Sequence, residues 1–143
     1  MAIQNGAPIA GASKAQKVVA QSTCEAEVIA LADAVKETVY LRMLAEDLKI
    51  AQKNPTTIYE DNEGAIAVAE SEFITKRCKH IRIKLGMLKS ESTELNTIKL
   101  EPIASEENIA DINTKALCEP TFVKLRDQFM SKVKPSILDE EDK

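Results

Sequence analysis

The sequence TTIYEDNEGAIAVA, residues 56–69, joins a strand pattern directly to a helix pattern. Thr56–Glu60 is rich in β-branched and aromatic residues, a composition that predicts a β-strand. Asp61 and Asn62 follow, and these residue types favour a helix N-terminus because their side chains accept hydrogen bonds from free backbone N–H groups. Apolar residues over Ala65–Ala69 then predict a short helix that ends near residue 71. Asp61 therefore stands directly after a strand, where open α/β sheets bind their ligands.

A long helix is predicted on the N-terminal side of this stretch, from Ser22 to about Lys49. Ser22 and Glu25 form a capping box, in which the hydroxyl and the carboxylate each accept a hydrogen bond from a free backbone N–H group. Apolar side chains then recur at helical spacing, at Val28, Leu31, Val35, Val39, Leu44 and Leu48. Before the cap, residues 13–21 predict a short strand, and residues 1–12 show no periodicity.

The C-terminal half continues the alternation of helices and strands. We expect a helix over residues 79–92, a strand over 95–100, a helix over 105–116 and a last helix from Pro120 to Phe129. This order of elements predicts an α/β fold. The domain organisation is predicted as one partial domain over residues 1–134, followed by a charged, disordered tail over 135–143.

Composition narrows the classes of protein to which this chain can belong. Its 143 residues suit one domain, and 44% hydrophobic residues suffice for a core. No apolar run approaches the roughly 18 residues of a membrane span, so we expect no membrane partner. Three scattered cysteines argue against a disulfide framework, and with a single histidine they exclude, or nearly exclude, a structural zinc site and a Ser-His-Asp triad. With no secretion signal at the N-terminus, an intracellular location, cytoplasmic or nuclear, is predicted.

Three acidic residues stand where carboxylates commonly do chemistry. Glu27 lies in the first turns of the long helix, Asp61 follows a strand, and Asp111 lies early in a short predicted helix. A two-metal phosphodiester site uses three or four such carboxylates to hold two Mg²⁺ ions about 4 Å apart. The chain has 23 acidic residues, however, and most acidic residues are solvated or cap helices. Spacing alone therefore leaves a metal site and a plain surface role both open.

Five segments, in order, resemble motifs of the RNase H domain in copia-type LTR retrotransposon Pol polyproteins. These segments are Gln21–Leu31 (QSTCEAEVIAL), Lys36–Arg42 (KETVYLR), Ile58–Ala67 (IYEDNEGAIA), Lys76–Ile81 (KRCKHI) and Glu107–Leu117 (ENIADINTKAL). The resemblance implies an RNase H-like fold, a mixed sheet flanked by helices. It also implies Mg²⁺-dependent cleavage, with Mn²⁺ as a substitute, of the RNA strand in RNA–DNA hybrids during reverse transcription. By position in these motifs, Glu27, Asp61 and Asp111 correspond to catalytic, metal-binding acids.

The family has a further catalytic aspartate, on a central first strand, in a motif like D-A-D-W-A. No acidic residue precedes Glu25 in this sequence, so that aspartate has no counterpart here. We therefore expect a domain truncated at its N-terminus, without the central first strand that would pair with Thr56–Glu60. The segment near residues 13–19 would be the third strand. Because the aspartate is missing, we expect impaired activity. The missing neighbouring strand leaves backbone N–H and C=O groups unpaired, so we expect the chain to be marginally stable, dimeric or completed by another strand.

A dense basic segment comprises Lys76, Arg77, Lys79, His80, Arg82 and Lys84. The segment would contact the phosphates of an RNA–DNA hybrid or another nucleic acid, although it also fits a solvated loop and helix start. The net charge of −4 gives no support for non-specific nucleic-acid binding by the chain as a whole. Two functions therefore remain open: an impaired ribonuclease H domain, or a catalytically dead, host-retained remnant that binds nucleic acid or protein.

Overall fold

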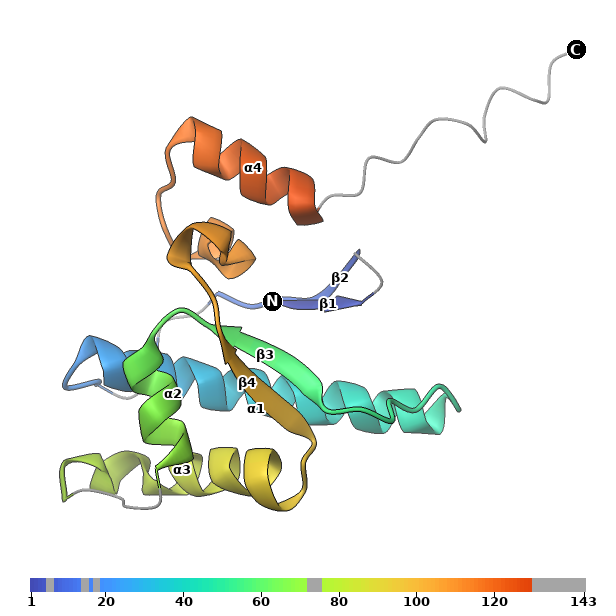
Figure 1. Ribbon diagram of the computed structural model, residues 1–143, viewed down its shortest axis with the longest axis vertical. Helices are drawn as coiled ribbons and strands as arrows, with labels where there is room; N and C mark the ends of the chain where they lie inside the picture. Colours follow the sequence, from blue (N-terminus) through green and yellow to red (C-terminus); the bar gives the residue numbers. More distant parts are fainter. Residues whose placement is uncertain (5–6, 14–15, 17–18, 72–75, 130–143) are drawn as a thin grey trace, which may run out of the picture. The chain divides into compact units, whose positions relative to one another are not determined.

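The computed structural model describes residues 1–4, 7–13, 16, 19–71 and 76–129. The chain divides into two compact units, one comprising residues 14–108 and the other residues 1–13 together with 109–143. Each unit is described by itself. Four α-helices and two small sheets make up the described part, which is therefore a mixed α/β structure (Figure 1). No helix among the described residues has the length and apolar character that crossing a membrane requires.

The larger unit is built around a pair of parallel strands. Its main elements are α1 (Thr23–Asp47), β3 (Thr56–Glu60), α2 (Glu63–Glu70), α3 (Arg82–Lys89) and β4 (Ile98–Pro102). The chain leaves β3, passes through α2 and α3, and returns along β4, with Thr56 opposite Ile98 and Glu60 opposite Pro102 (Figure 1). Parallel strands require such a crossover because the end of the first strand and the start of the second lie at opposite ends of the strand pair. The predicted α/β fold class is therefore confirmed.

The core of the larger unit joins the N-terminal half of α1 to α2, α3 and the strands. Val28, Val35, Leu88 and Ile98 are almost fully buried in one cluster, and Ile58 of β3 packs against it. Burying each such side chain contributes about 1.5–3 kcal/mol of stability. The apolar spacing within α1 is what places one side of this helix on the strands, so the core positions both elements that carry predicted site residues.

Helix termini follow the predicted capping residues. Ser22 accepts a hydrogen bond from the backbone N–H of Glu25, at 3.2 Å, and the Glu25 carboxylate accepts one from the backbone of Gln21. Asn62 caps α2 by accepting a bond from the backbone N–H of Ala65, at 3.2 Å. At the other end of α1, Lys49 adopts a positive φ of 64°. The long helix, the strand at Thr56–Glu60 and the short helix after it are thus confirmed.

The strand predicted over residues 95–100 begins later, at Ile98. The helical segment before it continues past Lys89 as a wider π-type turn over Ser90–Glu94. Leu95 still donates to the carbonyl of Ser90, and Asn96 turns the chain with a φ of 50°. The apolar residue Leu95 therefore closes a helical segment, and the predicted strand start was three residues too early.

Two other predicted elements also differ. The helix over residues 105–116 is replaced by two short 3₁₀ segments, Ser105–Glu107 and Ile109–Asn113, because the backbone at Asn108 is extended between them. The helix predicted over 79–92 begins as a 3₁₀ segment, Lys76–Ile81, before α3. The centre of the strand predicted over 13–21 lies outside the described residues, and its described residues belong to no strand.

The smaller unit contains a hairpin and the last helix. Strands β1 (Ala2–Gln4) and β2 (Ala7–Ala10) pair antiparallel. This hairpin was not predicted, because residues 1–12 show no periodicity in the sequence. The sequence Asn-Gly between the two strands is the strongest short-range hairpin signal. The predicted last helix is α4 (Glu119–Phe129), with Leu125 fully buried. The predicted domain boundary at 134/135 lies outside the described residues.

Candidate functional site

Two of the predicted metal ligands lie in the larger unit on elements that meet at the core. Glu27 is in the second turn of α1 and half-buried. Asp61 directly follows β3, is also half-buried, and accepts a hydrogen bond from the Ser105 hydroxyl at 3.0 Å. That bond ties the end of β3 to the segment after β4. The strand end and the helix start therefore present both carboxylates from well-packed elements.

Glu60 adds a third carboxylate, which sequence reasoning did not select. Its side chain is only 7% exposed, and it accepts a hydrogen bond from the backbone N–H of Asn62 at 3.2 Å. Burial raises the pKa of Glu60 to about 7, and the negative charges of Glu27 and Asp61 add to this rise, while the Asn62 bond opposes it. Glu27 and Asp61 are thus both close enough to act on one buried carboxyl group.

A sequence signal for Glu60 did exist. Side chains alternate between the two faces of a strand, so Glu60 shares a face with Ile58, and Ile58 packs on the core. The alternation of side chains along the strand therefore places the Glu60 carboxyl group on the apolar face of the sheet. An acid in such a position is a candidate for a shifted pKa and for function.

Asp111, the third predicted ligand, belongs to the smaller unit. It lies in the 3₁₀ segment Ile109–Asn113 and is buried. The Lys115 ammonium contacts its carboxylate at 2.7 Å, four residues further along the chain. The i,i+4 spacing of these residues could have predicted the pair. That Asp111 joins Glu27 and Asp61 in one site stays a prediction.

The donor set can be compared with what a metal ion requires. Carboxylate oxygens are the ligands that Mg²⁺ prefers, and the repulsion that Glu27 and Asp61 exert on Glu60 is what a cation would relieve. Over residues 1–4, 7–13, 16, 19–71 and 76–129, however, no three metal-ligating side chains are grouped closely enough to hold an ion. The residues therefore fit Mg²⁺ in charge and ligand type, and Glu27 with Asp61 provides an incomplete set.

His80 and Glu25 form a contact that links the basic segment to α1. The imidazole Nε2 of His80 contacts Oε1 of Glu25, whose other oxygen accepts the capping bond from Gln21. Glu25 is buried, so this pair holds the 3₁₀ segment before α3 against the start of α1. The pairing gives His80 a structural role, and its predicted contact with nucleic acid stays a prediction.

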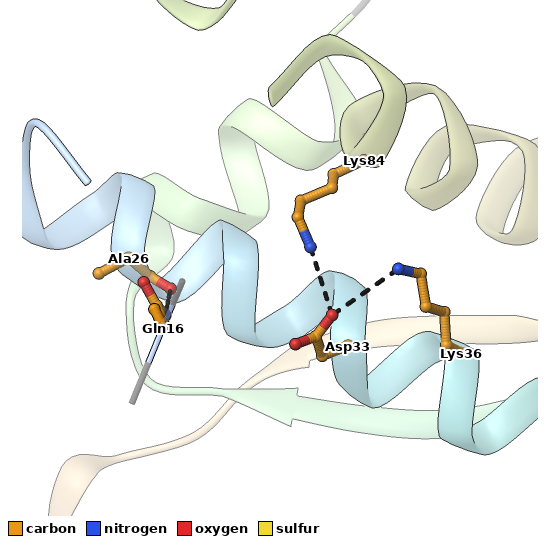
Figure 2. A network of polar contacts seen from close by, with 5 residues as sticks. All are labelled: Gln16, Ala26, Asp33, Lys36 and Lys84. Atoms are coloured by element: carbon orange, nitrogen blue, oxygen red, sulfur yellow. Dashed lines mark hydrogen bonds and ion pairs between the residues drawn. The ribbon is translucent and has the colours of Figure 1, made fainter. Parts of the chain in front are cut away.

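The other basic side chains divide into engaged and exposed groups. Lys84 donates to Asp33 of α1 at 3.3 Å, and Lys36 lies 3.8 Å from the same Asp33 oxygen (Figure 2). Lys79 and Arg82 are exposed, whereas the side chains of Lys76 and Arg77 lie outside the described residues. Within the described part of the segment, Lys79 and Arg82 are therefore the side chains best placed to reach a phosphate.

The chain is similar to three curated proteins from plants. The "Retrovirus-related Pol polyprotein from transposon TNT 1-94" of Nicotiana tabacum is 34% identical over 118 residues, which cover 82% of this chain and 9% of that protein. The corresponding polyprotein from transposon RE1 of Arabidopsis thaliana is 28% identical over 130 residues, 90% of this chain and 9% of the relative. That from transposon RE2 of the same plant is 29% identical over 115 residues, 80% of this chain and 8% of the relative.

The chain thus spans less than a tenth of the length of these relatives. No protein-family model matches it. No solved structure matches it either. The resemblance to retrotransposon Pol polyproteins is confirmed at the level of the polyprotein: the homologues of this chain are retrovirus-related Pol polyproteins from plant transposons.

Proposed function

We propose that this chain is part of an RNase H-type domain derived from a copia-type retrotransposon Pol polyprotein, related to cleavage of the RNA strand in RNA–DNA hybrids during reverse transcription. The observation that carries the proposal is that the negative charges of Glu27 and Asp61 both help to raise the pKa of the buried Glu60. These carboxylates come from a helix start and a strand end that are far apart in sequence. The relatives, as Pol polyproteins, are consistent with this role. An intracellular site of action, cytoplasmic or nuclear, is part of the proposal.

In this proposal Glu27, Asp61 and Asp111 would hold Mg²⁺, or Mn²⁺ in its place. The metal would supply an activated water and stabilise the leaving oxygen. The chain's own contribution is to fix the carboxylates: the α1 core holds Glu27, and the Ser105 hydroxyl holds Asp61. With its raised pKa, Glu60 carries a proton for much of the time near neutral pH, which limits the repulsion within the group.

The proposed domain is impaired as this chain stands. The given 143 residues contain no acidic residue before Glu25, and therefore none that matches the family's first aspartate. Among the described residues β3 pairs with β4 alone, which leaves the other edge of β3 open for a completing strand. We therefore expect weak or undetectable cleavage by the chain alone, and a gain when a strand-completing partner is supplied.

Metal binding provides the first test. Mn²⁺ affinity, measured by electron paramagnetic resonance, should fall at least several-fold in Asp61→Asn and in Glu27→Gln, because each loses one anionic ligand. Glu106→Gln is the matched control, since Glu106 is an exposed acid of the same unit. Any cleavage of a labelled RNA–DNA hybrid in Mn²⁺ should disappear in Asp61→Asn. Equal Mn²⁺ affinity in the wild type and all three variants would refute the proposed site.

The second candidate function is nucleic-acid binding without catalysis, the property expected of a dead remnant. It is favoured by the exposure of Lys79, in the 3₁₀ segment before α3, and of Arg82, the first residue of α3. In Lys79→Ala/Arg82→Ala, hybrid affinity should fall and the slope of log affinity against log salt should decrease by about 2, about 1 for each lost phosphate contact. Lys53→Ala, which removes an exposed lysine elsewhere, should leave the slope unchanged. An unchanged slope in the double variant would assign these residues to a solvated surface.

A further inference from the structure

The C-terminal half of α1 carries apolar side chains that the larger unit does not bury. Every buried residue of the helix lies at or before Val35. Beyond it, Tyr40 is 60% exposed and Met43 is 61% exposed, and Leu44 and Leu48 are exposed as well. Clusters of exposed apolar side chains of this kind commonly mark an interaction surface.

The spacing of these residues defines a seam along the helix. Lys36, Tyr40, Met43 and Asp47 are separated by four, three and four positions, the a/d spacing of a helix that packs against another helix. All four are exposed. The seam begins with a positive charge and ends with a negative one, and its apolar members lie between them. Such a pattern is complementary to itself when reversed.

We propose that this seam, Lys36–Tyr40–Met43–Asp47, binds the same seam of a second copy of the chain, with the two α1 helices antiparallel. A twofold axis between residues 41 and 42 places Lys36 of each copy opposite Asp47 of the other. The same axis places Tyr40 opposite Met43. A twofold interface requires this kind of self-complementarity, in which each contact occurs twice. Charge complementarity and apolar contact therefore favour the same register.

Lys36 can take up this role because Asp33 has a nearer partner. Lys84 of α3 lies 3.3 Å from the Asp33 carboxylate, whereas Lys36 lies 3.8 Å away (Figure 2). Lys84 is also the less exposed of the two lysines. If Lys36 turns toward a second copy, Asp33 remains neutralised by Lys84, so the new ion pair leaves no charge unpaired.

The seam is short, and this sets the expected strength of the interface. A stable dimer commonly buries about 800 Å² on each partner, more than four side chains on one helix supply. The association should therefore be a reversible monomer–dimer equilibrium that depends on protein concentration. This inference does not depend on the proposed nuclease function, since it concerns neither the carboxylates nor nucleic acid.

Sedimentation velocity over a concentration series tests the proposal by charge reversal. Lys36→Glu and Asp47→Lys should each weaken self-association at least tenfold, because each places like charges opposite one another. An equimolar mixture of the two variants should form heterodimers. In the mixed pair, the carboxylate introduced at position 36 faces the ammonium introduced at position 47, and the unchanged Lys36 faces the unchanged Asp47. Glu106→Lys, a charge reversal of an exposed acid outside the seam, should self-associate as the wild type does.

A spectroscopic probe locates the interface independently. The chain has no tryptophan, so Tyr40→Trp introduces a single reporter at the centre of the seam. Its emission should shift to shorter wavelength as protein concentration rises through the dimerisation range. A wild type that stays monomeric, a mixture that fails to form heterodimers, or an emission independent of concentration would overturn the proposal.

Discussion

Replacing Glu60 with glutamine removes a carboxyl group that the fold holds in an unfavourable environment. Burial is the main reason that the pKa of Glu60 rises from 4.5 to about 7, and the charges of Glu27 and Asp61 contribute in the same direction. Glutamine has nearly the same shape and can still accept the hydrogen bond from the backbone N–H of Asn62. It carries no charge at any pH. The substitution therefore isolates the cost of ionising a buried acid.

The direction of the pH dependence follows from the two pKa values. Because the folded-state pKa is above the unfolded value, the folded chain binds more protons than the unfolded chain between about pH 4.5 and 7. The contribution of Glu60 to stability is thus fully present below pH 4.5 and is lost as pH rises through 7. At about 1.4 kcal/mol for each tenfold change in proton affinity, the loss between pH 5 and 8 is about 2–3 kcal/mol.

Urea unfolding of wild type and Glu60→Gln at pH 5, 6, 7 and 8 measures this difference. The variant should gain about 2–3 kcal/mol relative to wild type between pH 5 and 8, because only the wild type must ionise a buried group. Glu106→Gln, at an exposed position, should follow the wild type at every pH. A difference between Glu60→Gln and wild type that stays constant with pH would show that the carboxyl group is solvated, which would refute the reasoning.

Three further substitutions test the local and tertiary contacts by urea unfolding. Lys49→Gly should stabilise the chain by about 1 kcal/mol, because Lys49 has a φ of 64° at the end of α1, where glycine is unstrained; a loss of stability would contradict this. Leu88→Ala should cost about 2–5 kcal/mol, since Leu88 is fully buried. Arg42→Lys should cost about 1–2 kcal/mol, because the Arg42 guanidinium donates to the carbonyls of Gln52 and Asn54 and to the Thr56 hydroxyl. An unchanged stability in Leu88→Ala would contradict the burial of Leu88, and an unchanged stability in Arg42→Lys would contradict the role of the Arg42 hydrogen bonds.

Several elements could be predicted from the sequence because their signals are local. The start of α1 depends on Ser22 and Glu25, and the start of α2 depends on Asn62, whose side chain bonds to a backbone group three residues away. Strand β3 shows itself by composition within five residues. In each case the groups that make the contact lie within about one helical turn or one strand, so sequence spacing determines their geometry.

The failures of prediction have the opposite origin. The start of β4 depends on pairing with β3, and the segment before it continued as a helical turn although Leu95 suggested a strand. Instead of the helix expected over residues 105–116, the chain forms two 3₁₀ segments, because the backbone at Asn108 is extended between them. Apolar spacing gives the type of element but not its ends, since tertiary pairing chooses among alternatives of nearly equal local energy.

For the candidate site, the sequence by itself determined which acids to consider, since motif position selected Glu27, Asp61 and Asp111. Only the tertiary structure decided that Glu60 is buried and that its pKa is raised, with the charges of Glu27 and Asp61 contributing to the rise. It also paired Lys84 with Asp33, 51 positions away in the sequence. Burial and charge interactions depend on which distant groups the fold brings together and how much water it removes, and neither quantity is encoded in the spacing of neighbouring residues.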